Sequence, residues 1–202
     1  MKKRYITAGI LLLAALTLTL CAVCQQSQQR LSQKLIRLHV VANSDAPDDQ
    51  AVKLLVRDAV LREAALALEN TDDPEAALQA AIPALTRAAN EMLCSQGRSD
   101  TASVSLRREL FPTREYDTFR LPAGVYKSLR VTIGKGEGRN WWCVVFPALC
   151  LPASSEELTQ ACLAAGFTEG EVAVLTGDTE TVELEFKTLE FLSKLKKVLW
   201  DA

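Results

Sequence analysis

Histidine is nearly absent from this 202-residue chain, in which His39 is the only one. A zinc site usually combines histidines with close cysteine pairs, so neither zinc nor another metal or cofactor is expected. Catalysis by a cysteine needs a base, and His39 with Cys143 and Asp45 is the only set of that kind. Cys143 lies among bulky apolar residues of a predicted strand, where a thiol is usually inert or paired. The sequence therefore favours a protein that is not an enzyme, with a cysteine hydrolase as an alternative.

Basic residues are not in excess either, because 23 lysines and arginines face 25 aspartates and glutamates. A chain with a net charge of −2 and no basic stripe does not suit nucleic acid. Adjacent carboxylates at 48–49, 72–73 and 156–157 each fall in the first turn of a predicted helix, where the helix dipole favours negative charge. They do not mark a catalytic pair, and no small-molecule substrate is expected.

What the sequence does contain is a long apolar run at its N-terminus. Three basic residues at positions 2–4 precede an apolar stretch from Ile6 to Val23. That length is at the lower limit for a bilayer-spanning helix and slightly long for a cleavable signal. Since the basic residues precede the stretch, the N-terminus should stay in the cytoplasm while the remainder is exported. We predict a signal peptide or membrane anchor over 1–24, a linker or stalk over 25–34 and one exported domain over 35–202.

Hydrophobic periodicity predicts that the exported domain is of the α+β class. Residues 35–42 alternate as a strand, with Arg37 and His39 on the side opposite Leu38 and Val40. The sheet is expected to be mostly antiparallel and packed with helices. We predict helices over 47–68, 74–95, 155–165 and 187–200, and strands over 35–42, 101–110, 125–133, 140–146, 171–175 and 182–186.

Several local signals refine this assignment. Ser44 or Asp45 suits the N-cap of the first helix, and Pro83 predicts a kink or break in the second. A strand follows the glycine-rich loop at 134–138, whereas a phosphate-binding loop needs a helix there. We therefore expect 125–146 to form one antiparallel hairpin with a glycine-rich turn.

Four cysteines remain in the exported part, where disulfides can persist. Pro147 and Ala148 supply a turn between Cys143 and Cys150, so we predict a disulfide between these two cysteines. Closing so small a loop stabilises by about 2 kcal/mol in the chain-entropy model. Cys94 and Cys162 lie on predicted helices and are expected as buried thiols, with a second disulfide as the alternative.

Two long segments of the chain resemble the stage II sporulation protein R family of endospore-forming bacteria. They are IRLHVVANSDAPDDQAVKLLVRDAVL at 36–61 and LPAGVYKSLRVTIGKGEGRNWWCVVFPALC at 121–150, in the same order and behind the same kind of export segment. The resemblance implies a signal rather than an enzyme, made in the forespore and exported into the space between the forespore and mother-cell membranes. There it would trigger a membrane-embedded aspartic protease that cleaves the inhibitory pro-sequence from the mother-cell sigma factor.

The family pattern assigns no catalytic residue, so the residues of interest are candidates for partner binding. Trp141 and Trp142 point to opposite faces of their strand, so one should enter the core while the other contacts a partner. Arg37 and His39 are expected to mark a polar surface near residues 43–45. An exported cysteine hydrolase and a cell-envelope binding module are the competing functions. The candidate partner-binding residues are His39, Asn43, Ser44, Asp45, Trp141 and Trp142.

Overall fold

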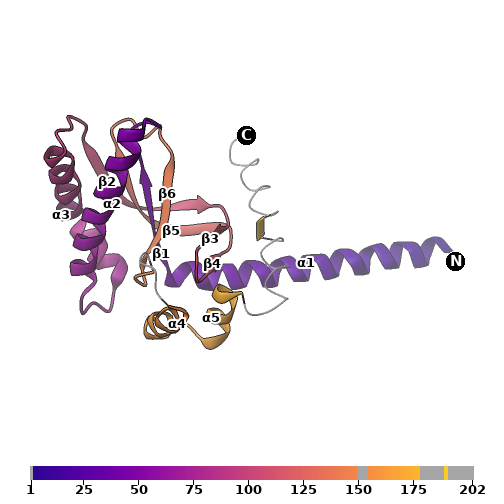
Figure 1. Cartoon of the computed structure of the whole chain (residues 1–202). Helices are drawn as coiled ribbons and strands as arrows, with labels where there is room; N and C mark the ends of the chain where they lie inside the picture. The colour runs from indigo at the N-terminus through magenta and orange to yellow at the C-terminus, as the bar shows by residue number, and fades with distance from the viewer. Residues whose placement is uncertain (1, 150–153, 178–188, 191–202) are drawn as a thin grey trace.

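The computed structural model describes residues 2–149, 154–177 and 189–190. Helices and strands alternate irregularly along the chain, as in an α+β protein (Figure 1). The elements are α1 (Lys2–Lys34), β1 (Ile36–Val41), α2 (Pro47–Leu68), α3 (Pro74–Ser95), β2 (Ala102–Phe111), β3 (Arg114–Glu115), β4 (Arg120–Leu121), β5 (Gly124–Ile133), β6 (Asn140–Phe146), α4 (Ser155–Ala164) and α5 (Glu169–Thr176).

The main sheet has four strands in the order β2-β5-β1-β6. β2 pairs antiparallel with β5, and β6 pairs antiparallel with β1, whereas β1 and β5 run parallel. A mostly antiparallel sheet is thus confirmed, but the predicted hairpin over 125–146 is wrong because β1 lies between its two strands. All six residues of β1 are buried, which suits a central strand with a neighbour on each side.

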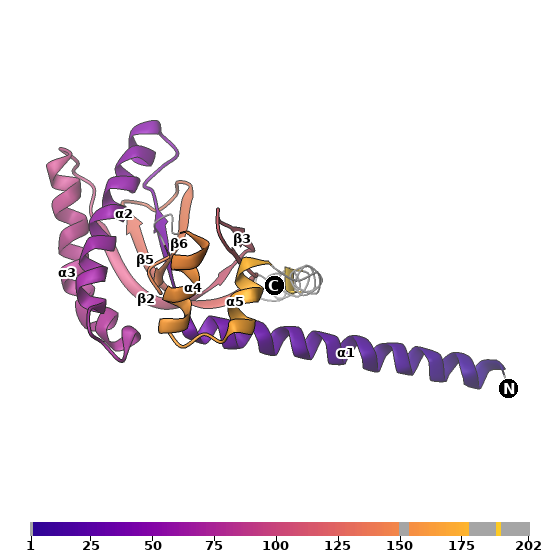
Figure 2. The same ribbon diagram turned by 60° about the horizontal axis from the view of Figure 1, so that its bottom comes forward.

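Helices α2 and α3 cover one face of this sheet, here called the helix-covered face (Figures 1 and 2). Leu38 and Val40 of β1 and Leu129 and Val131 of β5 point into the core between sheet and helices and are fully buried. From the helices, the residues that complete this core include Val56, Val60, Leu78, Leu85 and Leu93.

A second core lies against the other side of the sheet, here called the second face. It buries Phe111 and Tyr126 from the sheet together with Leu121 of β4. The last turns of α1 and the helices α4 and α5 close it through Leu31, Leu158 and Leu175, among others. The sheet therefore separates two cores, of which only the first resembles the simple sheet-and-helix layer expected from the sequence.

α1 runs without interruption from Lys2 to Lys34, so the predicted linker at 25–34 is helical. Leu31 is buried in the second core, and the Lys34 ammonium pairs with Glu171 of α5 at 2.6 Å. The helix is long and apolar enough over 9–34 to cross a membrane. Figure 2 shows it leaving the domain on the side away from α2 and α3.

Several local predictions turn out differently in the structure. The segment predicted as a strand at 171–175 belongs to helix α5, because Thr168 and Glu171 form a capping box and Gly177 ends the helix with a positive φ. α3 continues through Pro83, so the helix is not broken there. The predicted strand at 182–186 and most of the helix at 187–200 lie outside the described residues.

Candidate functional site

The segment Asn43–Asp45 does not cap α2 as predicted, since the cap residue is Ala46 and no side chain caps the helix. Asn43 and Ser44 instead donate hydrogen bonds to the same oxygen of Asp49, at 3.0 and 2.6 Å. Arg98, from the loop after α3, pairs with the other oxygen of that carboxylate. These hydrogen bonds and the arginine charge hold the pKa of Asp49 below its ordinary value, so the carboxylate stays ionised at its buried position.

The same segment also holds the glycine-rich loop between β5 and β6. The side chain of Asn43 accepts from the backbone N–H of Lys135 at 3.0 Å, and Asp45 accepts from that of Arg139 at 2.7 Å. A Cβ at Gly138 would lie 2.2 Å from the backbone oxygen of Ser44, so a larger residue does not fit there. Residues 43–49 and 134–139, here called the loop clasp, thus join the two sequence segments 36–61 and 121–150 structurally.

His39 lies at the centre of a polar cluster on the second face. Its Nδ1 is 3.2 Å from a carboxylate oxygen of Glu109, and its Nε2 is 2.8 Å from Oδ1 of Asn140. The imidazole stacks on the indole of Trp142 at 3.8 Å between ring centroids. Only 4% of His39 is exposed, so the polar surface predicted at this residue is formed by its neighbours instead.

Glu109 connects this cluster to two arginines. Arg107 and Arg130 both donate to its Oε1, at 2.7 and 2.8 Å. Burial alone would raise the pKa of Glu109, but hydrogen bonds from His39 and the two arginines outweigh it and place the pKa well below the ordinary value. The cluster therefore contains a fixed negative charge between two fixed positive charges.

Arg37, also expected at the surface, is fully buried on the same face. Its guanidinium lies against the rings of Phe111 and Tyr126, at 4.1 and 5.0 Å from their centroids, and donates to the Tyr116 hydroxyl at 3.0 Å. Nε and Nη1 lack a hydrogen-bond partner among the described residues, and burial lowers the pKa of this arginine. A buried cation stabilised mainly by aromatic rings is costly, because the rings replace only part of its hydration.

The two adjacent tryptophans do point to opposite faces, as predicted. Trp142 is half-buried against His39 and Phe111 of the second face. Trp141 is 36% exposed at the rim of the helix-covered face, where the guanidinium of Arg57 lies 4.5 Å from its ring. Trp141 is therefore the tryptophan with more surface to offer a partner.

The geometry does not assemble the cysteine hydrolase considered above. Cys143 pairs in register with Leu38 on the helix-covered face, whereas His39 points to the second face. Cys143 is disulfide-bonded, and its predicted partner Cys150 lies outside the described residues, so that pairing stays a prediction. Cys162 is a buried thiol as expected, and burial raises its pKa to about 11, but Cys94 is exposed.

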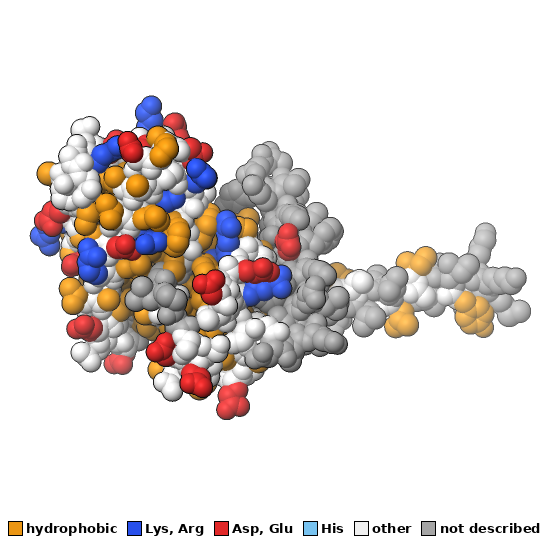
Figure 3. Space-filling view, viewed as in Figure 1, with side chains coloured by type: hydrophobic (Ala, Val, Ile, Leu, Met, Phe, Trp, Pro, Cys, Tyr) orange, Lys and Arg blue, Asp and Glu red, His pale blue; other side chains and the backbone are white. Residues whose placement is uncertain are grey.

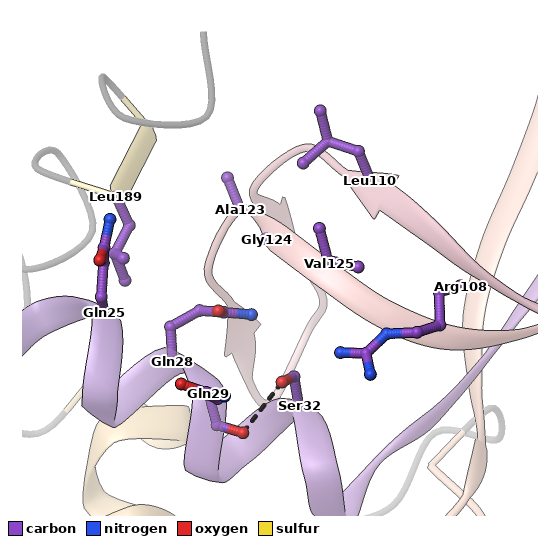
Figure 4. A pocket seen from close by; sticks show the side chains of 10 residues that line it. All are labelled: Gln25, Gln28, Gln29, Ser32, Arg108, Leu110, Ala123, Gly124, Val125 and Leu189. Atoms are coloured by element: carbon purple, nitrogen blue, oxygen red, sulfur yellow. Dashed lines mark hydrogen bonds between the residues drawn. The ribbon is translucent and has the colours of Figure 1, made fainter. Parts of the chain in front are cut away.

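A pocket of about 300 Å³ lies between the end of α1 and strands β2 and β5 (Figure 4). Gln25, Gln28 and Gln29 line one side, and Arg108 and Leu110 the other. The described residues contain no group of three or more potential metal-binding side chains, here or elsewhere. We interpret the pocket as a gap in the packing between α1 and the sheet.

Sequence reasoning missed Arg98, Arg107, Glu109 and Tyr116, which complete the two polar clusters. All four lie outside the two distinctive segments. Arg98, Glu109 and Tyr116 reach the first segment through contacts that span 49, 70 and 79 positions of the chain, and Arg107 is linked to it through Glu109. A weak signal was present at Glu109, a charged residue two positions before the apolar Phe111 on the same face of the strand. Such a residue needs a partner, but the sequence does not say which.

Comparison with known proteins agrees with the resemblance found in the sequence. The family model described as stage II sporulation protein R matches residues 32–156, which include all six strands with α2 and α3. Stage II sporulation protein R of Bacillus subtilis (strain 168) is 37% identical over 118 residues, covering 57% of this chain and 53% of that protein. The chain thus aligns with about half the length of that relative, and no solved structure matches it. The chain belongs to the stage II sporulation protein R family.

Proposed function

We propose that this protein is an exported sporulation signal that activates a membrane-embedded aspartic protease, which then processes the mother-cell sigma-factor precursor. Its place of action would be the space between the forespore and mother-cell membranes, where it couples gene expression in the two cells. The observation that carries the proposal is the family match over 32–156, which spans the whole sheet and the helices that cover it.

Three structural features support a binding role over a catalytic one. Asn43 and Asp45 hold the glycine-rich loop, and His39 is enclosed by Trp142, Glu109 and Asn140. The disulfide at Cys143 suits an oxidising compartment outside the cytoplasm. The apolar helix α1 would carry the domain to the membrane in which the protease lies.

Activation by binding requires that the domain has a higher affinity for the active state of the protease than for its inactive state. A shift from mostly inactive to mostly active takes a difference of roughly 5 kcal/mol, or about 10⁴-fold in affinity. An interface with a few buried aromatic or arginine contacts can supply this amount.

The test is co-expression of the full chain with the candidate protease and its sigma-factor precursor in a host that does not sporulate. Precursor cleavage is expected only when all three proteins are present and the chain is exported. A variant without residues 6–23 gives the matched control, because its domain stays in the cytoplasm. Cleavage that is independent of this chain, or of its export, would contradict the proposal.

His39→Ala separates binding from catalysis. A folded His39→Ala protein that still drives processing excludes a role for the only histidine as a catalytic base.

A further inference from the structure

The second face of the sheet is covered by the second core only in part, and the remainder carries polar side chains. The strand register places Ser105, Arg130, His39 and Trp142 side by side across all four strands. The next row towards the loop clasp consists of Ser103, Thr132, Val41 and Asn140. We call the polar face the set Ser103, Ser105, Arg107, Arg130, Thr132 and Asn140 with His39 beneath them. Four members of the set are exposed: Ser103, Ser105, Arg107 and Asn140.

The charge of this face is opposite to that of the chain as a whole. Arg107 and Arg130 share one oxygen of Glu109, and the guanidinium of Arg114 lies 5.7 Å from the Trp142 ring at its border. Two arginines thus pair with one carboxylate and a third arginine lies at the border of the face, on a chain with a net charge of −2. A local excess of positive charge on an acidic protein favours an acidic partner, because complementary charges speed association and exclude wrong partners.

Two side chains of this face, Arg130 and His39, are already held in place before any partner arrives. Arg130 also donates to the hydroxyl of Thr132 at 3.1 Å, and His39 is fixed between Glu109, Asn140 and Trp142. Binding to such a face loses little side-chain entropy, which is one of the main costs of association. This order distinguishes the face from a lysine-rich surface with freely moving charges.

The position of α1 gives the direction in which the face points. In both ribbon views α2 and α3 lie on one side of the sheet, while α1 extends away on the other (Figures 1 and 2). If α1 spans the membrane, the helix layer points away from the bilayer and the second face points towards it. Figure 3 shows the domain and the projecting helix in the same orientation as Figure 1.

The spacing argues for a protein rather than lipid as the partner. The apolar run ends at Val23, and eleven further helical residues, 24–34, separate it from β1 by about 16 Å along the helix at 1.5 Å per residue, while α5 and the ends of β2 and β5 lie alongside these residues. Charges of lipid headgroups are screened over about 8 Å at physiological ionic strength. A segment of a membrane protein that rises from the bilayer can reach the face, whereas the headgroup charges are largely screened at that distance.

From these observations we infer that the polar face is the docking surface for an acidic, extramembrane segment of the membrane protease. The inference rests on the proposed function and adds to it the surface and the chemistry of the contact. Carboxylates of the partner would pair with Arg107 and Arg130 in competition with Glu109, and its amide or hydroxyl groups with Ser103, Ser105 and Asn140.

The test introduces negative charge into the face in the co-expression system. Ser105→Glu changes an exposed residue whose side chain makes no hydrogen bond with the described residues, and Arg107→Glu reverses an exposed charge. Arg87→Glu is the matched control, because Arg87 is exposed on α3 on the other side of the sheet. With melting temperatures unchanged, each face variant should lower the rate of precursor cleavage about tenfold or more, and the control should not. Equal rates in all three variants would overturn the inference.

A second readout is independent of protease activation. A photo-crosslinking residue at position 105 of the full chain should form an adduct with the co-expressed protease, whereas the same residue at exposed Gln79 on α3 should not. An adduct with lipid only, or none, would overturn the inference. If the unmodified chain drives no cleavage, the proposed function fails, while adduct formation at position 105 still decides whether this face docks the protease.

Discussion

On the helix-covered face of the sheet, β1 contributes Leu38 and Val40, whereas on the second face the same strand contributes Arg37 and His39. All four residues are at most 4% exposed. The first pair belongs to an apolar cluster with side chains of β5, β6, α2 and α3. The second pair meets aromatic rings, a glutamate, an asparagine and a tyrosine hydroxyl. One strand of six residues thus supports two kinds of interior.

The two faces of the sheet contribute differently to stability and to function. Burial of apolar area is favourable without specific partners, at about 25 cal/mol per Å², so the helix-covered face can supply most of the folding free energy. Polar groups in the interior need particular partners and gain little net free energy when they find them. Their presence on the second face is better explained by function than by stability, and the following experiments test this division.

The largest effect is expected at Leu38, which is fully buried in the helix-covered core. Leu38→Ala should lower the free energy of unfolding by about 2 to 5 kcal/mol, because it removes apolar contacts and leaves a cavity. Chemical denaturation monitored by tryptophan fluorescence would measure the change. Leu66→Ala, an exposed position on α2, is the control and should change stability by less than about 0.5 kcal/mol. A loss below about 1 kcal/mol at Leu38 would contradict the assignment of the main core.

The next largest losses of stability are expected for the two adjacent tryptophans, of which one lies on each face of the sheet. Trp142→Ala removes stacking on His39 and contact with Phe111, and should cost about 2 to 3 kcal/mol. Trp141→Ala removes a partly exposed ring and its contact with Arg57, and should cost about 1 kcal/mol. Equal losses from the two substitutions would show that the faces are not as different as their contacts indicate.

The sequence predicts the helix-covered face much better than the second face. Alternation located β1, β5 and β6, and the proline and aspartates at the start of α2 gave the bounds of that helix. It did not give strand order, because β1 and β6 both alternate in the same way and neither pattern names its neighbour. A glycine-rich connection looked like a tight hairpin turn, yet it crosses over the end of β1 and is held there by Asn43 and Asp45.

The sequence identified residues of the candidate site but not the contacts that they make. Asn43, Ser44 and Asp45 have side chains that suit both a helix cap and a long-range hydrogen bond, and the sequence favoured the local option. Asn43 and Asp45 accept hydrogen bonds from Lys135 and Arg139, far along the chain, whereas Ser44 bonds locally to Asp49 and to the backbone N–H of Ala46. The segment 171–175, predicted as a strand, likewise belongs to helix α5, whose N-terminus is fixed by the capping box of Thr168 and Glu171.

Replacement of the buried Arg37 is expected to change the unfolding free energy by a smaller amount, and to raise it. Arg37→Met keeps an unbranched apolar side chain between Phe111 and Tyr126 and removes a buried charge with two unpaired nitrogens. We expect a gain in unfolding free energy of about 1 to 2 kcal/mol, since hydrophobic replacement of buried charges is often stabilising. Arg37→Ala is the control and should destabilise, because it leaves a cavity. A loss of stability in Arg37→Met would mean that the attraction between the guanidinium and the two rings stabilises the fold by more than the desolvation of the guanidinium costs.

The smallest effect at neutral pH is expected for Glu109→Gln, and its dependence on pH is the informative part. The pKa of Glu109 in the folded protein lies below its ordinary value of 4.5, so its ionised form stabilises the fold at pH above about 4.5. As the pH falls below that value the unfolded chain takes up the proton more readily than the folded one, and this contribution is lost. The wild type should therefore be more stable than Glu109→Gln by about 1 kcal/mol at pH 7, and the gap should narrow as the pH falls towards 3. Urea unfolding of both proteins between pH 3 and pH 7 measures the gap. A constant difference over this range would mean that Glu109 acts through its shape rather than its charge, and the polar face would then lose the fixed anion that neutralises one of its arginines.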